Sequence, residues 1–315
     1  MSTHPHHVPA GTIAVAAFAG ALIGLQSRAN GGLSVFLGNS REAALISFGT
    51  GFLVLLVMAA VSPALRSGLR AIRAAVIDRR LPRWQTLAGM MGAFFVIVQA
   101  YAVPMMGVAI FSVATIAGQS AMSLIVDRLG LRNGVHHRIT PRRVVTALIT
   151  VGAVAVSVAD RVEGSVGWIT LLALACGGIV AVQRALNAHI TDYSEHSYAT
   201  TWLNFFTGVG FLLVANFAFG AQALAAPPPG LSSWWMYTGG TIGVIYIALS
   251  SVLVQRLGVL VFTAVTVGGQ LLGSLLIDLA FPTHGVTLGI NVYAGVVLSC
   301  AAILMSIRRP KRASA

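Results

Sequence analysis

The chain has 315 residues, of which 57% are hydrophobic and only 9% are charged, and its mean hydropathy is +0.85. Soluble domains carry about 25% charged residues, so a water-soluble enzyme, a disordered chain and a disulfide-rich secreted scaffold are excluded. The net charge of +12 indicates membrane topology rather than nucleic-acid binding, because the basic residues lie almost entirely in gaps between apolar runs.

Ten apolar runs follow one another along the chain, each near the roughly 20 residues that a membrane-spanning helix needs. They are continuous rather than alternating, which favours helices over a barrel. The stretch from Trp84 to Val126 is long enough for two spans, with a turn between Pro104 and Gly107. We predict an all-α polytopic membrane protein with ten transmembrane helices, at residues 12–31, 43–62, 84–103, 107–126, 143–159, 166–187, 198–219, 234–254, 258–279 and 289–307.

The two halves of the chain resemble each other. Gln26 and Asn30 in the first predicted helix correspond to Gln183 and Asn187 in the sixth. Each half is therefore predicted to be one five-helix repeat, at 11–160 and 161–307, between an N-terminal tail (1–10) and a basic C-terminal tail (308–315). Other matches are Phe48, Thr50 and Gly51 with Phe205, Thr207 and Gly208, Trp84, Gly89 and Gly92 with Trp235, Gly240 and Gly243, and Gly107, Gly118, Gln119, Ser123 and Asp127 with Gly258, Gly269, Gln270, Ser274 and Asp278.

An odd number of spans in each repeat makes the second repeat enter the membrane from the opposite side. The charges support this inversion, because basic residues concentrate in cytoplasmic loops. With both termini cytoplasmic, most basic residues fall in the loops after the second and fourth helices and in the C-terminal tail. The corresponding loops of the second half, 219–233 and 281–289, contain no Lys or Arg. We expect two inverted-topology repeats in a bacterial-type inner membrane.

These motifs resemble the drug/metabolite transporter superfamily, in its YdcZ-like branch of inner-membrane proteins. The resemblance rests on Gln-x-x-x-Asn in the first helix of each half, on Ser-Phe-Gly-Thr-Gly and Asn-Phe-Phe-Thr-Gly, and on Gly-Gln-x-x-x-Ser-x-x-x-Asp in the fourth and ninth helices. It covers nearly the whole chain, counted twice, so the chain looks like a fused duplicate of a five-helix unit. The resemblance implies a ten-helix, inverted-repeat transporter that exports small organic molecules.

Two polar stripes are predicted near the middle of the membrane. At 1.5 Å per residue, Gln119 and Gln270 each lie about 18 Å into a hydrocarbon core of about 30 Å, where inverted-repeat transporters place their sites. Positions i, i+4 and i+8 share a helix face. The stripes could line a substrate path or, with equal weight, hold the bundle together by interhelical hydrogen bonds. They consist of Gln119, Ser123 and Asp127, and of Gln270, Ser274 and Asp278.

Further polar residues lie toward the ends of the first and sixth helices. Gln26 and Asn30 share one helix face, as do Gln183 and Asn187. They could line two vestibules of an alternating-access path, and the alternative, favoured for the asparagines, is hydrogen bonding at helix ends. Arg184 has no basic counterpart in the first half. It could extend to the membrane interface, or it could contact an anion or a carboxylate.

The two aspartates close their stripes at helix C-termini, where the helix dipole disfavours a carboxylate. A nearby cation is therefore expected, with Arg28, Arg41 or Arg161 as partners for Asp278, and a solvated helix end as the alternative. Neither Asp127 nor Asp278 lies in mid-span. This weighs against a central carboxylate as a proton carrier and leaves the coupling ion undetermined.

An enzyme is not expected. A lipid-acting intramembrane enzyme, the main alternative, would need a nucleophile, a metal cluster or an acid pair at depth. The buried cysteines, Cys176 and Cys300, are interpreted as packing residues. The five interior histidines all fall in predicted loops: His136, His137, His189, His196 and His284.

A channel or scaffold subunit is the remaining alternative, although no filter or ring of pore-lining charges is visible. No P-loop, cofactor or metal site is found. The expected partners are a small-molecule substrate and the lipid bilayer, with a homodimer left open and nucleic acid excluded. The sequence specifies neither the substrate nor the direction of transport.

Overall fold

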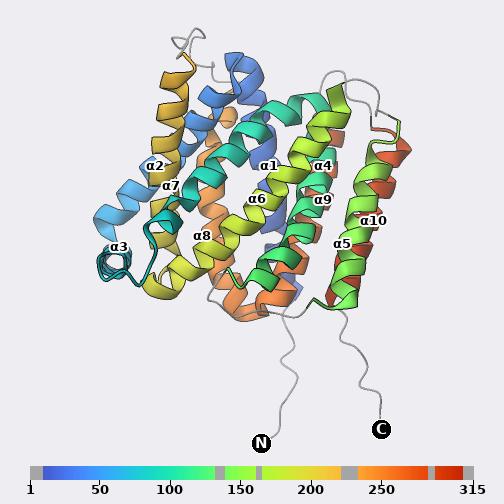
Figure 1. The fold of residues 1–315 in the computed structure, drawn as a ribbon. Coiled ribbons are helices and arrows are strands. Elements are labelled where there is room, and N and C mark those ends of the chain that lie inside the picture. Colours follow the sequence, from blue (N-terminus) through green and yellow to red (C-terminus); the bar gives the residue numbers. More distant parts are fainter. Residues whose placement is uncertain (1–9, 132–138, 161–164, 221–232, 283–287, 308–315) are drawn as a thin grey trace, which may run out of the picture.

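The computed structural model describes residues 10–131, 139–160, 165–220, 233–282 and 288–307, and these ranges contain helices and no strand. The predicted tails, the loop at 221–232 and Arg161 lie outside them. Figure 1 shows a helical bundle in which α1 begins and α10 finishes at the same end. The elements are α1 (Ala10–Leu37), α2 (Ser40–Val61), α3 (Pro63–Ile77), η1 (Arg83–Leu87), α4 (Ala88–Leu129), α5 (Pro141–Ser157), α6 (Ser165–Ser194), α7 (Ser197–Ala218), η2 (Trp234–Thr238), α8 (Gly239–Leu257), α9 (Val259–Ala280) and α10 (Ile290–Ile307).

Seven helical segments in the described part of the chain are long and apolar enough to cross a membrane. One of them, 83–129, contains two of the predicted spans, and a shorter apolar helix covers 290–305. The predicted all-α membrane architecture is therefore confirmed, and each of the ten predicted runs is largely helical, although α1 and α6 extend six and seven residues beyond their predicted ends at 31 and 187. The number of membrane crossings stays a prediction.

Glycine breaks the helical path at two equivalent points. Gly107 interrupts α4 with φ 84° and ψ 166°, and Gly258 separates α8 from α9 with φ 74° and ψ 155°. Side-chain-bearing residues rarely adopt this backbone region. The first break coincides with the turn that the sequence predicts after Pro104. In Figure 1 the bend of α4 and the junction between α8 and α9 lie at opposite ends of the bundle.

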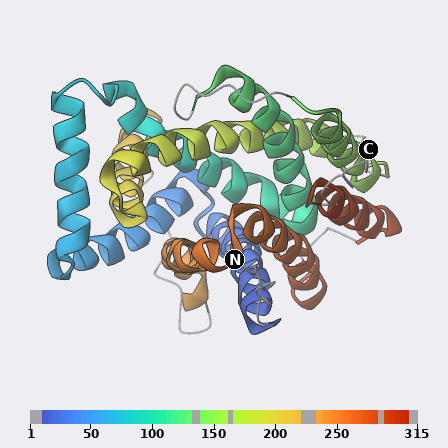
Figure 2. The ribbon, with the colours of Figure 1, turned by 90° about the horizontal axis from the view of Figure 1, so that it is seen from below.

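One helix, α3, forms where the sequence predicts an arginine-rich loop. Ser62 caps it, because its Oγ accepts a hydrogen bond of 3.2 Å from the Leu65 amide, and Pro63 occupies its first position. The helix is amphipathic, so it does not register as an apolar run. Its buried residues pack toward α6 and α7, and seen from below it lies at the edge opposite α5 and α10 (Figure 2). The exposed face carries Arg66, Arg70 and Arg73, and the buried face Leu65, Gly68, Ile72 and Ala75.

The two halves pack against each other through glycine contacts that the repeat relates. Gly20 of α1 lies against the Thr266 carbonyl of α9, and Gly177 of α6 lies against the Thr115 carbonyl of α4. A Cβ at either glycine would overlap the opposing backbone, so these helices approach more closely than side chains would allow. The same relation holds for Gly269 with Ala17 and Gly118 with Leu174, for Gly51 with Phe205 and Gly208 with Phe48, and for Gly240 with Ser47 and Gly89 with Asn204.

The largest apolar core surrounds α4 beyond Gly107. Ile110 and Phe111 of this segment are almost fully buried, and they belong to one cluster with Ile169 of α6 and Leu271 of α9. The segment is therefore fixed on several sides by helices of both halves. It forms the rigid wall against which the candidate site is built.

The glycine contacts predict a large difference between two adjacent substitutions. Gly269→Ala would place a methyl group in the Ala17 backbone and should lower the free energy of unfolding by about 1–3 kcal/mol. Gly268→Ala is the matched control, because a Cβ there meets no atom within 4 Å. Unfolding by SDS in mixed micelles measures both. Equal stability of the two variants would contradict the close packing of α1 on α9.

Candidate functional site

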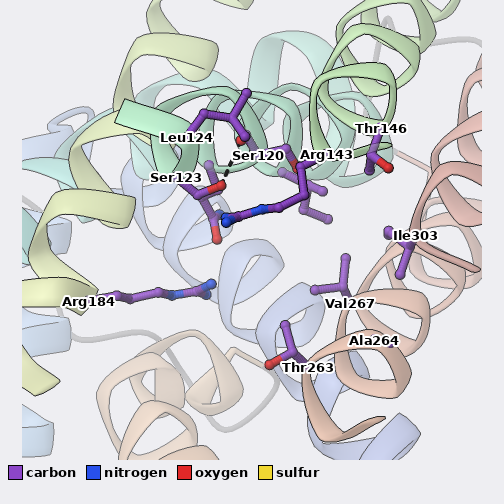
Figure 3. Close-up of a pocket in the computed structure, with 12 residues that line it drawn as sticks. Ser120, Ser123, Leu124, Arg143, Thr146, Arg184, Thr263, Ala264, Val267 and Ile303 are labelled. Atoms are coloured by element: carbon purple, nitrogen blue, oxygen red, sulfur yellow. Dashed lines mark hydrogen bonds between the residues drawn. The ribbon is translucent and has the colours of Figure 1, made fainter. Parts of the chain in front are cut away.

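A cavity of about 240 Å³ lies between helices of the two halves. It sits near the end of the bundle where α4 and α10 finish and α5 and α9 begin. Figure 3 shows polar side chains from several helices facing this space. The lining residues are Ile116, Gln119, Ser120, Ser123 and Leu124 of α4, Arg143 and Thr146 of α5, Arg184 of α6, Thr263, Ala264 and Val267 of α9, and Ile303 of α10.

The predicted stripe on α4 faces this cavity. Gln119 and Ser123 are one helical turn apart, and both line the wall together with Ser120. The Ser123 hydroxyl donates a hydrogen bond of 2.8 Å to the Ser120 carbonyl. On the facing helix, Thr146 donates in the same way to the Arg142 carbonyl, at 3.0 Å. These hydroxyls therefore satisfy their own helices and keep lone pairs free for the cavity.

An ion pair lies at the edge of the cavity. Arg143 of α5 donates from Nη2 to the Asp127 carboxylate in the last turn of α4. The two side chains are 36% and 31% exposed, so the pair is only partly screened by solvent. Arg143 is thus the cation that the sequence leads one to expect beside Asp127.

Arg184 extends its side chain into the cavity (Figure 3). It lies ten residues before Ser194, the last residue of α6, which corresponds to about 15 Å along the helix axis. Among the described residues it has no ion pair or hydrogen bond. The sequence leaves two alternatives for Arg184, extension to the membrane interface or contact with an anion or a carboxylate. In the structure its guanidinium faces the cavity and not a helix end.

The predicted stripe on α9 is packed instead of lining the cavity. Gln270 is buried beside Gly20 of α1, and the Ser274 hydroxyl lies 2.8 Å from the hydroxyl of Ser112. Asp278 accepts hydrogen bonds from the backbone amides of Val108, at 3.0 Å, and Ala109, at 2.8 Å. These are the first two residues after the break at Gly107, so Asp278 caps the helix that restarts there.

Two of the three arginines proposed as partners of Asp278 can be placed. Arg28 interacts electrostatically with Asp278. Arg41 donates from Nη2 to the Phe219 carbonyl at 3.4 Å and lies over the Phe219 ring. The principal partners of Asp278 are nevertheless backbone amides, which a search for paired charges in the sequence does not consider.

The hydrogen-bonded hydroxyl pair, Ser112 and Ser274, has an equivalent pair at the cavity. The repeat relates Ser112 and Ser274 to Thr263 and Ser123, respectively. The first pair is hydrogen-bonded, whereas the second pair lies on facing walls of the cavity (Figure 3). The same contact is therefore made at one end of the bundle and open at the other.

The aspartates differ in the same way. Asp278 caps the helix restart after Gly107, but Asp127 pairs with Arg143. No side chain of the described part caps the start of α9 after Gly258. The cap and the hydroxyl contact are thus made near Gly107 and are not made near Gly258.

The amide residues of α1 and α6 do not line the cavity. Asn30 is fully buried and donates to Gln99 Oε1 at 2.7 Å, and Gln99 donates to the Ser27 hydroxyl at 2.8 Å. The carboxamide oxygens of Asn30 and of the equivalent Asn187 are both buried without a hydrogen-bond partner. The glutamines make equivalent contacts, Gln26 against Gly243 and Gln183 against Gly92. Asn30 thus makes an interhelical hydrogen bond to α4, and the role of these four residues in substrate vestibules stays a prediction.

Four polar lining residues are missing from the sequence-based candidates: Ser120, Arg143, Thr146 and Thr263. Arg143 is counted in the sequence as one of the loop arginines that set topology, and α5 begins two residues earlier than predicted. The spacing of Arg143 and Thr146, three residues apart on one helix face, is the signal that could have found both. Thr263 could have been found as the repeat equivalent of Ser112, but only if similar residues as well as identical ones are compared between the halves.

The prediction that all interior histidines lie in loops is wrong for His189. Helix α6 continues to Ser194, and His189 Nδ1 lies 2.7 Å from Gln85 Oε1. His196 directly precedes α7, and the other three lie outside the described residues. In the described ranges no three His, Cys, Asp or Glu side chains are grouped to hold a metal ion.

Known proteins match both halves of the chain. The profile of the family described as "Putative inner membrane exporter, YdcZ" matches residues 11–156 and 168–305. A curated protein, "Inner membrane protein YdcZ" from Escherichia coli (strain K12), is 32% identical over 142 residues, which cover 44% of this chain and 91% of that protein. The relative therefore corresponds in length to about one half of this chain.

The broken symmetry of the two asparagines can be measured. Asn30→Ala leaves Gln99 without its donor in a buried position, so we expect a loss of about 1–2 kcal/mol in the free energy of unfolding. Asn187→Ala is the matched control and should be nearly neutral, because among the described residues its side chain, unlike that of Asn30, makes no hydrogen bond. Unfolding in mixed micelles measures both. A larger loss for Asn187→Ala would contradict the network.

Proposed function

Because the chain belongs to the YdcZ family of inner-membrane proteins, we propose that it is a secondary transporter that exports small organic molecules by alternating access between two inverted repeats. The single observation that carries the proposal is the contrast between the two ends of the bundle. Contacts that the repeat relates are made at the Gly107 end and replaced by a cavity at the Gly258 end.

The inversion of the repeats has independent support. Helices α1 and α6 begin at opposite ends of the bundle, and so do the helices that follow Gly107 and Gly258 (Figure 1). The glycine contacts between halves occur in equivalent pairs, as a pseudo-two-fold axis requires. Among the predicted loops, only those on the proposed cytoplasmic side are rich in arginine.

Alternation exchanges the two sets of interactions. Closing the cavity would bring Ser123 to Thr263 and would bring the Asp127 carboxylate to the amides that follow Gly258. Opening the other end would separate Ser112 from Ser274 and release the cap that Asp278 provides. The helix cap and the hydroxyl contact broken at one end are of the same chemical kind as those formed at the other, and only the Asp127–Arg143 ion pair has no equivalent. A ligand can shift an equilibrium between two states that differ by a few kcal/mol.

The alternative functions have less support. Family membership favours transport over catalysis on lipids. A channel would need a continuous path, whereas buried hydrogen bonds join α9 to α4 just beyond Gly107. A scaffold would not require a cavity between its halves.

The inverted topology predicts labelling from opposite sides. Val61 ends α2 and Ala218 ends α7, and the repeat relates these two exposed residues. In a chain with Cys176→Ala and Cys300→Ala, Ala218→Cys should react with a membrane-impermeant thiol reagent in intact cells. Val61→Cys should react only after permeabilisation. Reaction of both in intact cells would disprove the inversion.

Alternation between the two states predicts that two engineered cysteine pairs, one at each end of the bundle, can form disulfides. In the same cysteine-free background, Ser112→Cys with Ser274→Cys should crosslink readily on mild oxidation, because the native hydroxyls lie 2.8 Å apart. Ser123→Cys with Thr263→Cys should also crosslink, because the alternative state brings these positions together. Mass spectrometry detects both crosslinks. Failure of the second pair to crosslink, while the first does so, would contradict alternating access.

The same cysteine variants test whether transport depends on alternation. In proteoliposomes loaded with a panel of labelled metabolites, the wild-type chain should release at least one compound faster than protein-free vesicles. Oxidation of the Ser112→Cys, Ser274→Cys variant should reduce that release to background, and a reducing agent should restore it. Release that persists in the fully crosslinked variant would exclude alternation as its route.

A further inference from the structure

The ionisable side chains that line the cavity in the described structure are both arginines, Arg143 and Arg184. The nearest carboxylate is Asp127, which pairs with Arg143. One positive charge is therefore balanced at the edge of the cavity, and the charge of Arg184 is left over. The site as a whole carries one unit of excess positive charge.

Arg184 lies within α6, and its exposed side chain faces the cavity. An arginine inside a transmembrane helix is costly unless its guanidinium is hydrated or paired. Such residues usually pair with a carboxylate or a backbone carbonyl. Arg184 has neither among the described residues, and its guanidinium offers up to five N–H donors to the cavity. A ligand that accepts hydrogen bonds and carries negative charge would satisfy it.

The rest of the wall limits the size and shape of that ligand. The volume of about 240 Å³ lies just below the roughly 300–1,000 Å³ of sites for drug-sized molecules. Gln119, Ser120 and Thr263 offer neutral polar groups, while Ile116, Leu124 and Val267 are apolar. The cavity therefore suits a small molecule with one charged end and an apolar body.

A cation is disfavoured for the converse reason. It would meet two guanidinium groups, and the one carboxylate nearby is already engaged. Repulsion between like charges is stronger in a partly desolvated site than in bulk water. Neutral molecules would leave the charge of Arg184 uncompensated.

We propose that this cavity selects a small organic anion, such as a monocarboxylate with an apolar body, and that Arg184 is its principal anchor, with Arg143 as a second contact. The proposal rests on the proposed transport function and names the substrate class of the same site. A monoanion would neutralise the excess charge of the site, and the guanidinium fork of Arg184 can hold a carboxylate through two parallel hydrogen bonds.

The test measures the charge selectivity of the cavity without any knowledge of the substrate. Thr263→Cys is introduced into the full-length chain with Cys176→Ala and Cys300→Ala, since Thr263 is an exposed residue of the cavity wall. Its reaction rates with anionic sulfonatoethyl methanethiosulfonate and cationic trimethylammonioethyl methanethiosulfonate are compared with those of a free thiol. The ratio of anionic to cationic rate should exceed that of the free thiol by roughly fivefold at low salt.

Three further variants decide whether Arg184 is the cause. Arg184→Gln should reduce the ratio several-fold, whereas Arg184→Lys should retain most of it, because lysine keeps the charge. Arg70→Gln, on the exposed face of α3, is the matched control and should leave the ratio unchanged. A ratio equal to that of the free thiol, or one that Arg184→Gln does not change, would overturn the proposal.

The outcome can be separated from that of the transport proposal. Reagent selectivity needs no solute flux, so a chain that transports nothing could still show an anion-selective cavity. That result would count against the transporter and not against the anion site. Conversely, release of only neutral or cationic compounds from proteoliposomes, with the crosslinks behaving as expected, would keep the transporter and exclude the anionic substrate.

Discussion

The constraint that shapes the structure is the need to satisfy backbone amides where a helix restarts inside a membrane protein. In hydrocarbon an unpaired amide costs several kcal/mol. Gly107 turns the chain in a backbone conformation that glycine tolerates. The helix that follows begins with backbone amides that have no carbonyl of their own helix to donate to. Asp278, at the end of α9 in the other half, accepts from two of them. The first half thus depends on the second to complete its backbone hydrogen bonds at this restart.

The glycine break and the aspartate that could cap it are present in both halves, but the cap is formed only at Gly107. The repeat supplies Gly258 and Asp127 as equivalents of Gly107 and Asp278, yet Asp127 pairs with Arg143 and α9 starts without a side-chain cap. The two ends of the bundle therefore differ in this cap. The glycine contacts that the repeat relates, of α1 on α9 and of α6 on α4, are both made. The difference between the ends therefore leaves this close packing between the halves unchanged.

Much of this fold follows from the sequence. Apolar runs of membrane-spanning length give the helices, and the positions that the halves share already include both helix-breaking glycines, both aspartates and the glycines of the close contacts. The sequence could not show which of two contacts related by the repeat, one near Gly107 and one near Gly258, is formed in the structure. Gln119 and Gln270 occupy equivalent positions of the repeat, but one faces a cavity and the other is buried beside Gly20. This difference depends on how the helices of the two halves pack, which the pattern of each helix does not contain. Helix α3 escaped prediction because its arginines lower the hydropathy of an amphipathic segment.

Arg143 shows how one residue can serve topology and the site together. By position it belongs with the basic residues that hold the start of α5 on one side of the membrane, and its side chain also reaches the cavity and binds Asp127. Asp127 is the residue that the repeat relates to the Asp278 cap, so Arg143 holds away from α9 the carboxylate that would close that end. A carboxylate arriving in the cavity would compete with Asp127 for the same guanidinium. The proposed anion site and the proposed alternation therefore share one arginine, and occupation of the cavity would weaken the contact that keeps it open.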